Sequence, residues 1–524
     1  MTNYKFIFCI LIDGLRFDVF SDPKYRKLLP NISKIIDKGF LKKLISNGMI
    51  TQVAMPSFFT QTFPLDYGGH NYGIKERPKS FIEIIKNNGF ITNFVSSSYI
   101  TGPFRNYEKG CDNVINLCDH SSIIEMYIRQ FLNHEIEMKK KKKNSKKKFD
   151  ELFKSSYLET LNYALDNKTR SNLKFMPRKF SKQTDLKIKR LLDEKKLLMS
   201  NPDLVLSKIT SIPSTYYHYF VGDKKINKFK LFLIRVIEKL KSVLDIFLKN
   251  KIGLNFQFFP VYCCPTAKEV FENAETLVKE NSFNFIHIYD AHHATKSGRF
   301  FNYLYKLKFL LKLIKINGSK KFFRGILYDL SLLYIDEQFK NFLDNQKSKN
   351  KIENSLFIFF GDHGTGIDPD RDSKLCKELG FRGYYEYLDV PFILSPVKKK
   401  PNNNKSHDIM SISATILDLL NLKQHQSFLG KSVFKDGDDF IISESTGKGN
   451  CDLRNKNIFF IISNEDFKLM VLFDGKKINP MRFYDKRVDK RELENQVEKS
   501  VYKNQIRIMI QFLKKKRFKL FIKD

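Results

Sequence analysis

The stretch KFIFCILIDG, Lys5 to Gly14, decides how the rest of the chain is interpreted. It is a continuous apolar run, rich in β-branched and aromatic residues, that stops at a carboxylate and a glycine. A strand buried on both faces of a parallel sheet has this composition, because neither face meets water. The run therefore predicts a central strand that delivers Asp13 at its carboxyl end.

Two later segments repeat this pattern of an apolar strand followed by Asp and His. They are FNFIHIYDAHH, Phe283 to His293, and NSLFIFFGDHG, Asn354 to Gly364. The segment SFIEIIKNNGFITNFVSS adds a helix that closes near Gly89 and a further strand. Since open α/β folds place their sites at the carboxyl edge of the sheet, we expect the polar strand ends to meet there.

The polar residues at these strand ends are candidate metal ligands. Carboxylates buried together are costly unless a cation compensates them, and Asp with His supplies the oxygen and nitrogen donors that zinc or manganese accepts. A capping Asp beside a buried His is the ordinary alternative for any one of these motifs. The candidates are Asp13, Asp290, His292, His293, Asp362 and His363, with His407 in KSHDIM added from its place before the helix SATILDLLNL.

Changes in composition and hydrophobic pattern along the chain predict three regions. Residues 1–120 and 281–430 read as one α/β core, 121–280 as a basic and mostly helical insertion, and 431–524 as a small sheet of short strands followed by a basic amphipathic helix. The insertion contains the lysine tract Lys139 to Lys148, which reads as a solvated loop, and the basic amphipathic stretch Phe229 to Asn250. The more specific alternative is that these basic segments contact an anionic membrane surface.

The composition says more about the location and partners of the protein than about its reaction. The 524 residues carry a formal charge of +35, which favours anionic partners such as a sulfated or phosphorylated substrate, although codon drift toward Lys and Asn would produce the same excess. No zinc-finger or RNA-binding signature accompanies the charge, so no specific nucleic acid is predicted. Seven cysteines form no CxxC pair, and no run reaches the roughly 18 apolar residues of a membrane span. These features predict a cytoplasmic protein, with peripheral membrane attachment as the alternative; nothing predicts its oligomeric state.

Taken in order, the motifs resemble the sulfatase-like branch of the alkaline phosphatase superfamily. The resemblance rests on CILIDGLRFD, AMPSFFTQTFP, SFIEIIKNNGFITNF, FIHIYDAHH, NSLFIFFGDHG, YYEYLDVPFILSP, ATILDLLNL and FYDKRVDKRELENQ. It implies an α/β fold with a mixed sheet sandwiched by helices, and metal-assisted hydrolysis or transfer of sulfate or phosphate esters with one or two Ca, Zn or Mn ions. It also implies that Asp13, Asp362 and His363 hold one ion, and that Asp290 and His292 contact the ester or a second ion. His407 is a further candidate ligand of that second ion.

The same resemblance exposes a difficulty at the nucleophile. Members of the superfamily carry a Thr, Ser or modified Cys two residues before a Pro, and here that position is Ala54, before Pro56 and Ser57. The Cys and Arg needed for formylglycine are also absent. Four explanations stay open: a metal-activated water attacks, a shifted Thr51 or Ser57 serves as nucleophile, the site only binds ligands, or the alignment is displaced by a few residues.

The leading hypothesis is a metal-dependent hydrolase or transferase of sulfate or phosphate esters on a sugar, lipid or polysaccharide, without formylglycine. The alternative is an inactive protein that binds an anionic glycan or a protein partner through the same pocket. Arg16, Arg382 and Lys468 are candidate contacts for the ester anion, because a developing negative charge needs positive groups near it.

Overall fold

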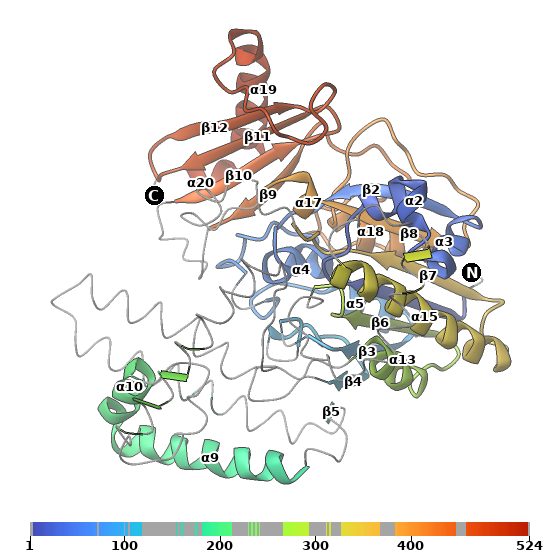
Figure 1. The fold of residues 1–524 in the computed structure, drawn as a ribbon, viewed down its shortest axis with the longest axis vertical. Helices are drawn as coiled ribbons and strands as arrows, with labels where there is room; N and C mark the ends of the chain where they lie inside the picture. The colour runs from blue at the N-terminus through green and yellow to red at the C-terminus, as the bar shows by residue number, and fades with distance from the viewer. Residues whose placement is uncertain are drawn as a thin grey trace.

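The structure is a computed structural model in which a large sheet with helices on both faces adjoins a smaller sheet near the C-terminus (Figure 1). It describes residues 4–70, 73–98, 100–102, 105–117, 173–175, 181–211, 266–292, 326–366, 383–446 and 457–521, with isolated residues between 154 and 315.

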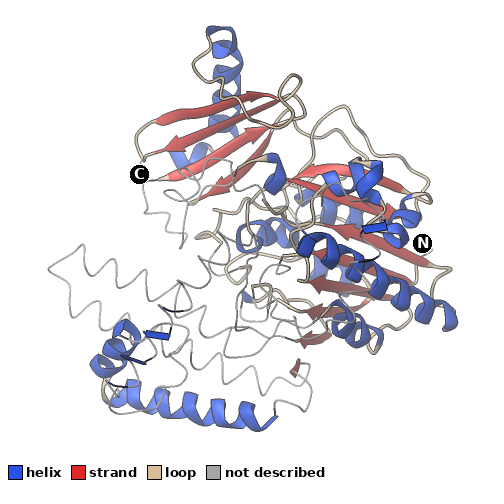
Figure 2. Ribbon diagram, viewed as in Figure 1, coloured by secondary structure: helices blue, strands red, loops and turns tan. Residues whose placement is uncertain are grey.

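Eight described strands form the large sheet, in the order β2-β8-β7-β1-β6-β3-β4-β5. The strand β8 runs antiparallel to both of its neighbours, and the other pairs are parallel (Figure 2). The expected mixed α/β sheet between helices is therefore confirmed. The strands are β1 (Phe6–Ile12), β2 (Phe40–Ile45), β3 (Ile91–Ser96), β4 (Asn113–Asn116), β5 (Leu173–Phe175), β6 (Ser282–Ile288), β7 (Ser355–Phe360) and β8 (Asp389–Ser395).

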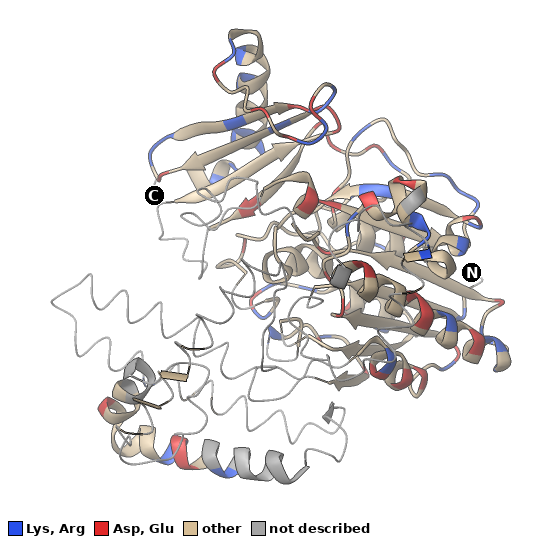
Figure 3. Cartoon of the chain, in the orientation of Figure 1, with Lys and Arg blue, Asp and Glu red and all other residues tan. Residues whose placement is uncertain are grey.

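The central strand β1 serves two separate apolar cores, because successive side chains of a strand point to opposite faces. Its even-numbered residues pack with α3 (Pro30–Ile36), α13 (Ala267–Glu275) and α15 (Ile326–Ser348). Its odd-numbered residues pack with α4 (Thr51–Thr60), α5 (Phe81–Asn87) and α18 (Met410–Leu419). This division explains why the sequence of β1 is apolar throughout rather than alternating. Most strands of the large sheet accordingly carry few charged residues (Figure 3).

The helix and strand expected around Gly89 are confirmed. Ser80 and Glu83 form a reciprocal capping box at the start of α5. Gly89 then reverses the chain with φ of 88°, a conformation that glycine adopts without strain. Short helices elsewhere in the core are α1 (Asp18–Ser21), α2 (Pro23–Arg26) and α17 (Tyr385–Leu388).

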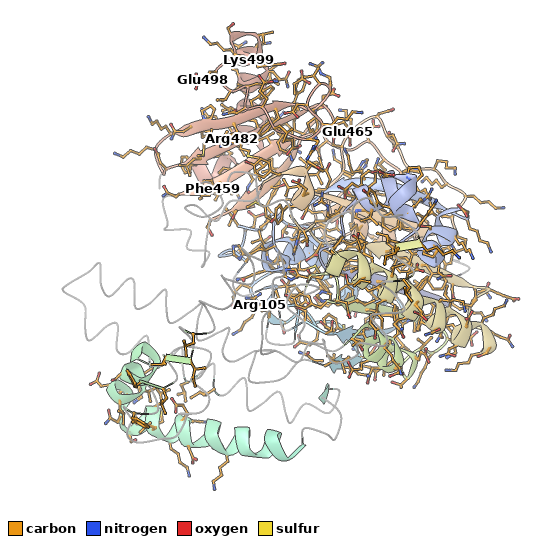
Figure 4. The ribbon with its side chains drawn as sticks, viewed as in Figure 1. Arg105, Phe459, Glu465, Arg482, Glu498 and Lys499 are labelled. Atoms are coloured by element: carbon orange, nitrogen blue, oxygen red, sulfur yellow. The ribbon has the colours of Figure 1, made fainter. Side chains whose placement is uncertain are left out.

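A second, antiparallel sheet has the strand order β12-β11-β10-β9. Its strands are β9 (Ile441–Ser445), β10 (Ile458–Ser463), β11 (Phe467–Phe473) and β12 (Ile478–Asp485), followed by η6 (Ser500–Tyr502), α19 (Lys503–Lys516) and α20 (Phe518–Phe521). One face of the sheet packs on α19, and the other, which includes Phe459, packs on core residues such as Tyr384 (Figure 4). The sequence predicted the first three strands. It missed β12, which contains Pro480 and is only half-buried over most of its length.

The predicted insertion at 121–280 stays a prediction, because most of its residues, the lysine tract included, lie outside the described part. Within that range, α9 (Ser181–Ser200) and α10 (Pro202–Ser211) are helical, while α13 packs on the core. No helix among the described residues is both long and apolar enough to cross a membrane.

A buried ion network ties the chain after α4 to the C-terminal region. The Arg517 guanidinium lies 2.7 Å from Asp66 Oδ1 and donates to Glu444 Oε2 at 3.4 Å. Glu444 is fully buried and also accepts from the backbone N–H of Leu65 at 3.1 Å. The cation therefore compensates a carboxylate that water cannot reach.

We predict that Arg517→Ala lowers the free energy of unfolding by about 3–5 kcal/mol, because the mutation leaves Glu444 buried without its cation. Urea denaturation at pH 7 measures the change. Lys340→Ala is the matched control, since the pair of Lys340 with Asp344 is exposed and its loss should not be measurable. Equal effects of the two variants would show that the network contributes nothing.

Candidate active site

Three neighbouring strands of the large sheet end at one edge, and a polar turn follows each. Both β6 and β7 run parallel to β1, with Ile288 opposite Ile12 and Phe360 opposite Leu11. Asp13, Asp290 and Asp362 come directly after these strands. The expectation that the three polar strand ends share one edge of the sheet is confirmed.

The turn after β7 fixes the orientation of His363. A Cβ on Gly364 would lie 2.0 Å from the carbonyl oxygen of Glu386, so no larger residue fits there. His363 Nδ1 lies 2.6 Å from the carbonyl oxygen of Gly364. A carbonyl can only accept, so Nδ1 carries the proton that it donates. In the neutral ring, Nε2 is then left with its lone pair facing the site.

Asp13, His292 and His363 form a group of potential metal ligands whose donor atoms all lie within 4.8 Å of one another. Asp13 Oδ1 is 3.4 Å from His363 Nε2 and 3.9 Å from His292 Nε2. Asp362 Oδ2 lies 3.6 Å from His363 Nε2. With Asp362 beside it, the group brings two carboxylates and two imidazoles together, a donor set that suits zinc or manganese.

The electrostatics of the two carboxylates fit a bound cation. Asp13 and Asp362 are both fully buried. Neither oxygen of Asp362, and not Oδ1 of Asp13, has a hydrogen-bond partner among the described residues. Burial raises the pKa of Asp13 well above its usual value, and the Asp362 charge raises it further, against smaller opposing effects of His363 and Thr51. Because unpaired carboxylates are costly to bury, a divalent ion between these atoms would relieve the cost.

Thr51, the first residue of α4, lies against this group. Its Oγ1 is 2.9 Å from Asp13 Oδ2 and 3.1 Å from His363 Nε2, and the side chain is buried. Helix α4 begins here because the carbonyl of Ile50 accepts from the N–H groups of Val53 and Ala54. Ala54 therefore stands one turn further along the helix, where it belongs to the apolar core with Met55.

Comparison with known proteins agrees with the fold described above. Residues 326–422 match the family model described as Sulfatase. No curated protein matches the chain. A solved 2-O GAG sulfatase has 11% identity and a TM-score of 0.50, over 99% of this chain and 93% of that one. The structure of Ps i-CgsB with k-i-k-neocarrahexaose has 12% identity and a TM-score of 0.50, over 98% and 92%.

The solved structure of a phosphonate monoester hydrolase from Silicibacter pomeroyi has 11% identity and a TM-score of 0.51, over 98% of this chain and 95% of that one. The chain has the fold of the sulfatase-like branch of the alkaline phosphatase superfamily. At these identities the solved structures show the fold alone. What this sulfatase-like chain does must be argued from its own site.

The other residues predicted for the sulfatase-like site lie apart from the ligand group or outside the described part. Ser57 is buried in α4, and its Oγ has no hydrogen-bond partner among the described residues. Asp290 follows β6 but does not belong to the group of Asp13, His292 and His363. Arg382 lies outside the described residues.

His407 is also elsewhere, so its expected role as a metal ligand is not supported. Its Nε2 lies 3.1 Å from the carbonyl oxygen of Lys435. Burial, and then the charge of Lys42, lower its pKa to about 4. Its place in the sequence suggested a ligand, but its side chain packs beneath the loop that carries Lys435.

Two basic residues suggested as ester contacts already have acidic partners. Arg16 donates to both carboxylate oxygens of Asp18, at 3.0 and 2.8 Å. Lys468 lies 2.6 Å from Glu492 in a buried pair. Neither cation is therefore available to an ester without losing its partner.

Sequence reasoning missed one residue of the candidate site, His287. It lies within β6, its side chain is fully buried, and its Nε2 is 3.2 Å from Asp13 Oδ2. The signal was the alternation of FNFIHI, which places His287 on the same face as Phe283 and Phe285, the face covered by α4. A polar residue on that face, one position before the strand ends, has to point toward the site.

We predict that the protein binds Zn²⁺ or Mn²⁺ and that Asp362→Ala weakens binding by more than about 100-fold. Loss of a direct ligand should exceed the 10–100-fold cost of losing an outer partner. Isothermal titration calorimetry on protein stripped with EDTA measures the affinity. Asp344→Ala, on an exposed surface, is the control. Wild-type affinity in Asp362→Ala would contradict the site.

A second prediction concerns pH. Because the folded-state pKa of Asp13 is raised, the stability that its proton supplies is present at low pH and is lost as the pH rises through that pKa. In metal-free protein, Asp13→Asn should therefore melt increasingly above wild type as the pH rises, and added metal should reverse the order. Thermal melts from pH 4 to 9 measure the difference. A difference that stays constant with pH would contradict the raised pKa.

Proposed function

We propose that this protein is a metal-dependent hydrolase of sulfate or phosphate esters, with Thr51 as its nucleophile. The observation that carries the proposal is the position of Thr51 Oγ1, 2.9 Å from Asp13 Oδ2 and 3.1 Å from His363 Nε2. A hydroxyl is a weak nucleophile unless a base or a metal activates it, and here it meets two acceptors inside the candidate metal site. Of the four explanations for Ala54, this favours a shifted nucleophile, with Thr51 as the attacking residue.

The residues around Thr51 would prepare it for attack. Its single hydroxyl proton can pass to Asp13 Oδ2, which lies at hydrogen-bond distance. A divalent ion held by Asp13, Asp362 and His363 would lower the pKa of the hydroxyl and offset the charge of the ester. Thr51 also stands at the amino end of α4, where the N–H groups and the helix dipole favour an anionic group.

The reaction would proceed in two displacements. In the first, the Thr51 oxygen bonds to the sulfur or phosphorus atom, the bond to the alcohol oxygen breaks, and the alcohol takes up a proton. In the second, a water oxygen displaces the Thr51 oxygen, which releases sulfate or phosphate and restores the hydroxyl. His292 is the most accessible member of the group, with 27% of its side chain exposed, and so is the member placed to contact the leaving alcohol.

An anionic ester on a sugar is the substrate class that we propose. Two of the structures with the same fold are, by their own descriptions, a GAG sulfatase and a protein solved with a carrahexaose. The excess of Lys and Arg over Asp and Glu, 92 against 57, favours an anionic substrate, whether a sulfate or a phosphate ester. The phosphonate monoester hydrolase with this fold keeps phosphorus esters within the proposal.

The alternative of a purely binding protein rested on Ala54. Ala54 belongs to the apolar core, but the hydroxyl of Thr51 meets the ligand group, so the alanine does not by itself exclude a reaction. We therefore keep binding without catalysis only as an outcome of the experiment below.

We predict that Thr51→Ala lowers kcat on aryl sulfate or aryl phosphate esters on the order of 10⁴-fold, as expected for loss of a nucleophile. Thr51→Ser, which keeps a hydroxyl, should retain measurable turnover. Steady-state assays with added Zn²⁺, Mn²⁺ or Ca²⁺ measure the rates, and intact-mass analysis after acid quenching should detect a sulfate or phosphate adduct in the wild type and in Thr51→Ser but not in Thr51→Ala.

Two controls complete this experiment. Ser57→Ala lies on the same helix and should leave kcat unchanged. Ala54→Thr restores the superfamily pattern but adds atoms to a packed core, so it should lower stability without raising activity. Activity gained in Ala54→Thr, together with full activity in Thr51→Ala, would overturn the proposal. A wild type that binds the metal yet turns over none of these esters would favour the binding alternative.

A further inference from the structure

The buried histidine of β6 takes part in a chain of hydrogen bonds that ends at Asp13. His287 is fully buried, with Nε2 3.2 Å from Asp13 Oδ2. On the other side of the ring, Nδ1 lies 2.6 Å from Thr101 Oγ1 and 3.3 Å from Ser96 Oγ. Both ring nitrogens are thus engaged, one by a carboxylate and one by hydroxyl groups.

The partners of the ring decide which nitrogen carries the proton. His287 is fully buried between these partners, and a neutral imidazole has one N–H to share between its two nitrogens. The ionised Asp13 that would bind a cation can only accept, whereas the Thr101 hydroxyl can donate. The consistent arrangement places the proton on Nε2, where it is donated to Asp13 Oδ2, while the hydroxyl of Thr101 donates to Nδ1.

The two oxygens of Asp13 consequently have different surroundings. Oδ2 accepts from Thr51 Oγ1 at 2.9 Å and from His287 Nε2 at 3.2 Å. Oδ1 has no hydrogen-bond partner among the described residues, and it is the oxygen that faces His363 and His292. Two donors on one side of the carboxylate therefore leave the other oxygen directed at the ligand group.

We propose that His287 is a positioning residue that, held in one tautomer by Thr101, fixes Asp13 so that Oδ1 alone is presented to the divalent cation. The inference deepens the proposed function, since it assumes the cation at this site. A ligand whose orientation is fixed before the ion arrives loses less conformational freedom on binding, and partners of this kind typically contribute 10–100-fold to metal affinity. Fixing Oδ2 by the same two hydrogen bonds also holds the acceptor for the Thr51 proton in place.

The alternation of strand residues explains why this arrangement arises in this fold. The odd-numbered residues of β1 and the odd-numbered residues of β6 both face α4. Continuing each strand on that face gives Asp13 and His287, which meet beneath the first turn of α4 and thus beside Thr51. The end of β3 and the loop after it close the group from the far side, because Ser96 is the last residue of β3 and Thr101 lies in the loop.

The test compares three variants of metal-free protein by titration with Mn²⁺ and Zn²⁺. His287→Leu removes the donor and should weaken binding 10–100-fold. His287→Gln keeps an N–H near the position of Nε2 and should recover most of the affinity. Thr101→Val leaves the imidazole in place but removes the hydroxyl that fixes its tautomer, so an intermediate loss is expected. Urea denaturation shows whether each variant is folded.

Ser97→Ala is the matched control, because the Ser97 hydroxyl lies in the same buried loop but donates to the backbone oxygen of His287 at 3.0 Å rather than to the ring. It should bind the metal as the wild type does. Equal affinity in wild type, His287→Leu and Thr101→Val would overturn the positioning role. An equal loss in Ser97→Ala would assign the effect to the loop as a whole.

A spectroscopic measurement separates this inference from the proposed function. In metal-free protein labelled with ¹⁵N at histidine, at a pH where Asp13 is ionised, the ring of His287 should show a protonated Nε2 and an unprotonated Nδ1. If the wild type binds no divalent cation while this tautomer is seen, the proposed function fails and the hydrogen-bond chain stands. If Nδ1 carries the proton, the positioning role is wrong whatever the protein binds.

Discussion

The burial of two carboxylates, Asp13 and Asp362, at the ends of adjacent parallel strands is the constraint on which the site depends. Each would be ionised in water, and together inside the protein they repel each other. Hydrogen bonds offset this cost only in part. Donors cover Oδ2 of Asp13, while Oδ1 and both oxygens of Asp362 lack donors among the described residues. Uncovered carboxylate oxygens of this kind are what the proposed divalent cation would compensate.

The segment that follows the C-terminal sheet helps to position His363 through a series of hydrogen bonds. Glu492 accepts from the backbone N–H of Tyr385 at 3.0 Å and so holds the start of α17. The carbonyl of Tyr387 in α17 accepts from Gly364, whose own carbonyl fixes the tautomer of His363. Glu492 lies in the RELEN segment near the end of the chain. The terminal segment thus orients a candidate metal ligand without approaching it.

Much of this could be predicted from the sequence, because it depends on local patterns. Strands that are apolar throughout and end in Asp identified the sheet and its polar edge. Two features could not be predicted in this way. His407 stands in a suggestive motif, but its direction depends on the loop that carries Lys435. His287 lies inside an apolar strand, and its importance appears only when the face shared with Asp13 and α4 is known.

The nucleophile shows why a motif and a position can disagree. Counting back from Pro56 leads to Ala54, yet what places a side chain at the metal site is the start of α4, and that start is set by Ile50. A Cβ on Gly48 would lie 2.8 Å from the backbone nitrogen of Ala54, so the chain turns tightly there and enters the helix early. Thr51, the first residue of α4, reaches Asp13, whereas Ala54, one turn later, belongs to the apolar core. The capacity for reaction therefore has to be judged at Thr51, whose hydroxyl meets the ligand group, and not from the residue before Pro56 alone.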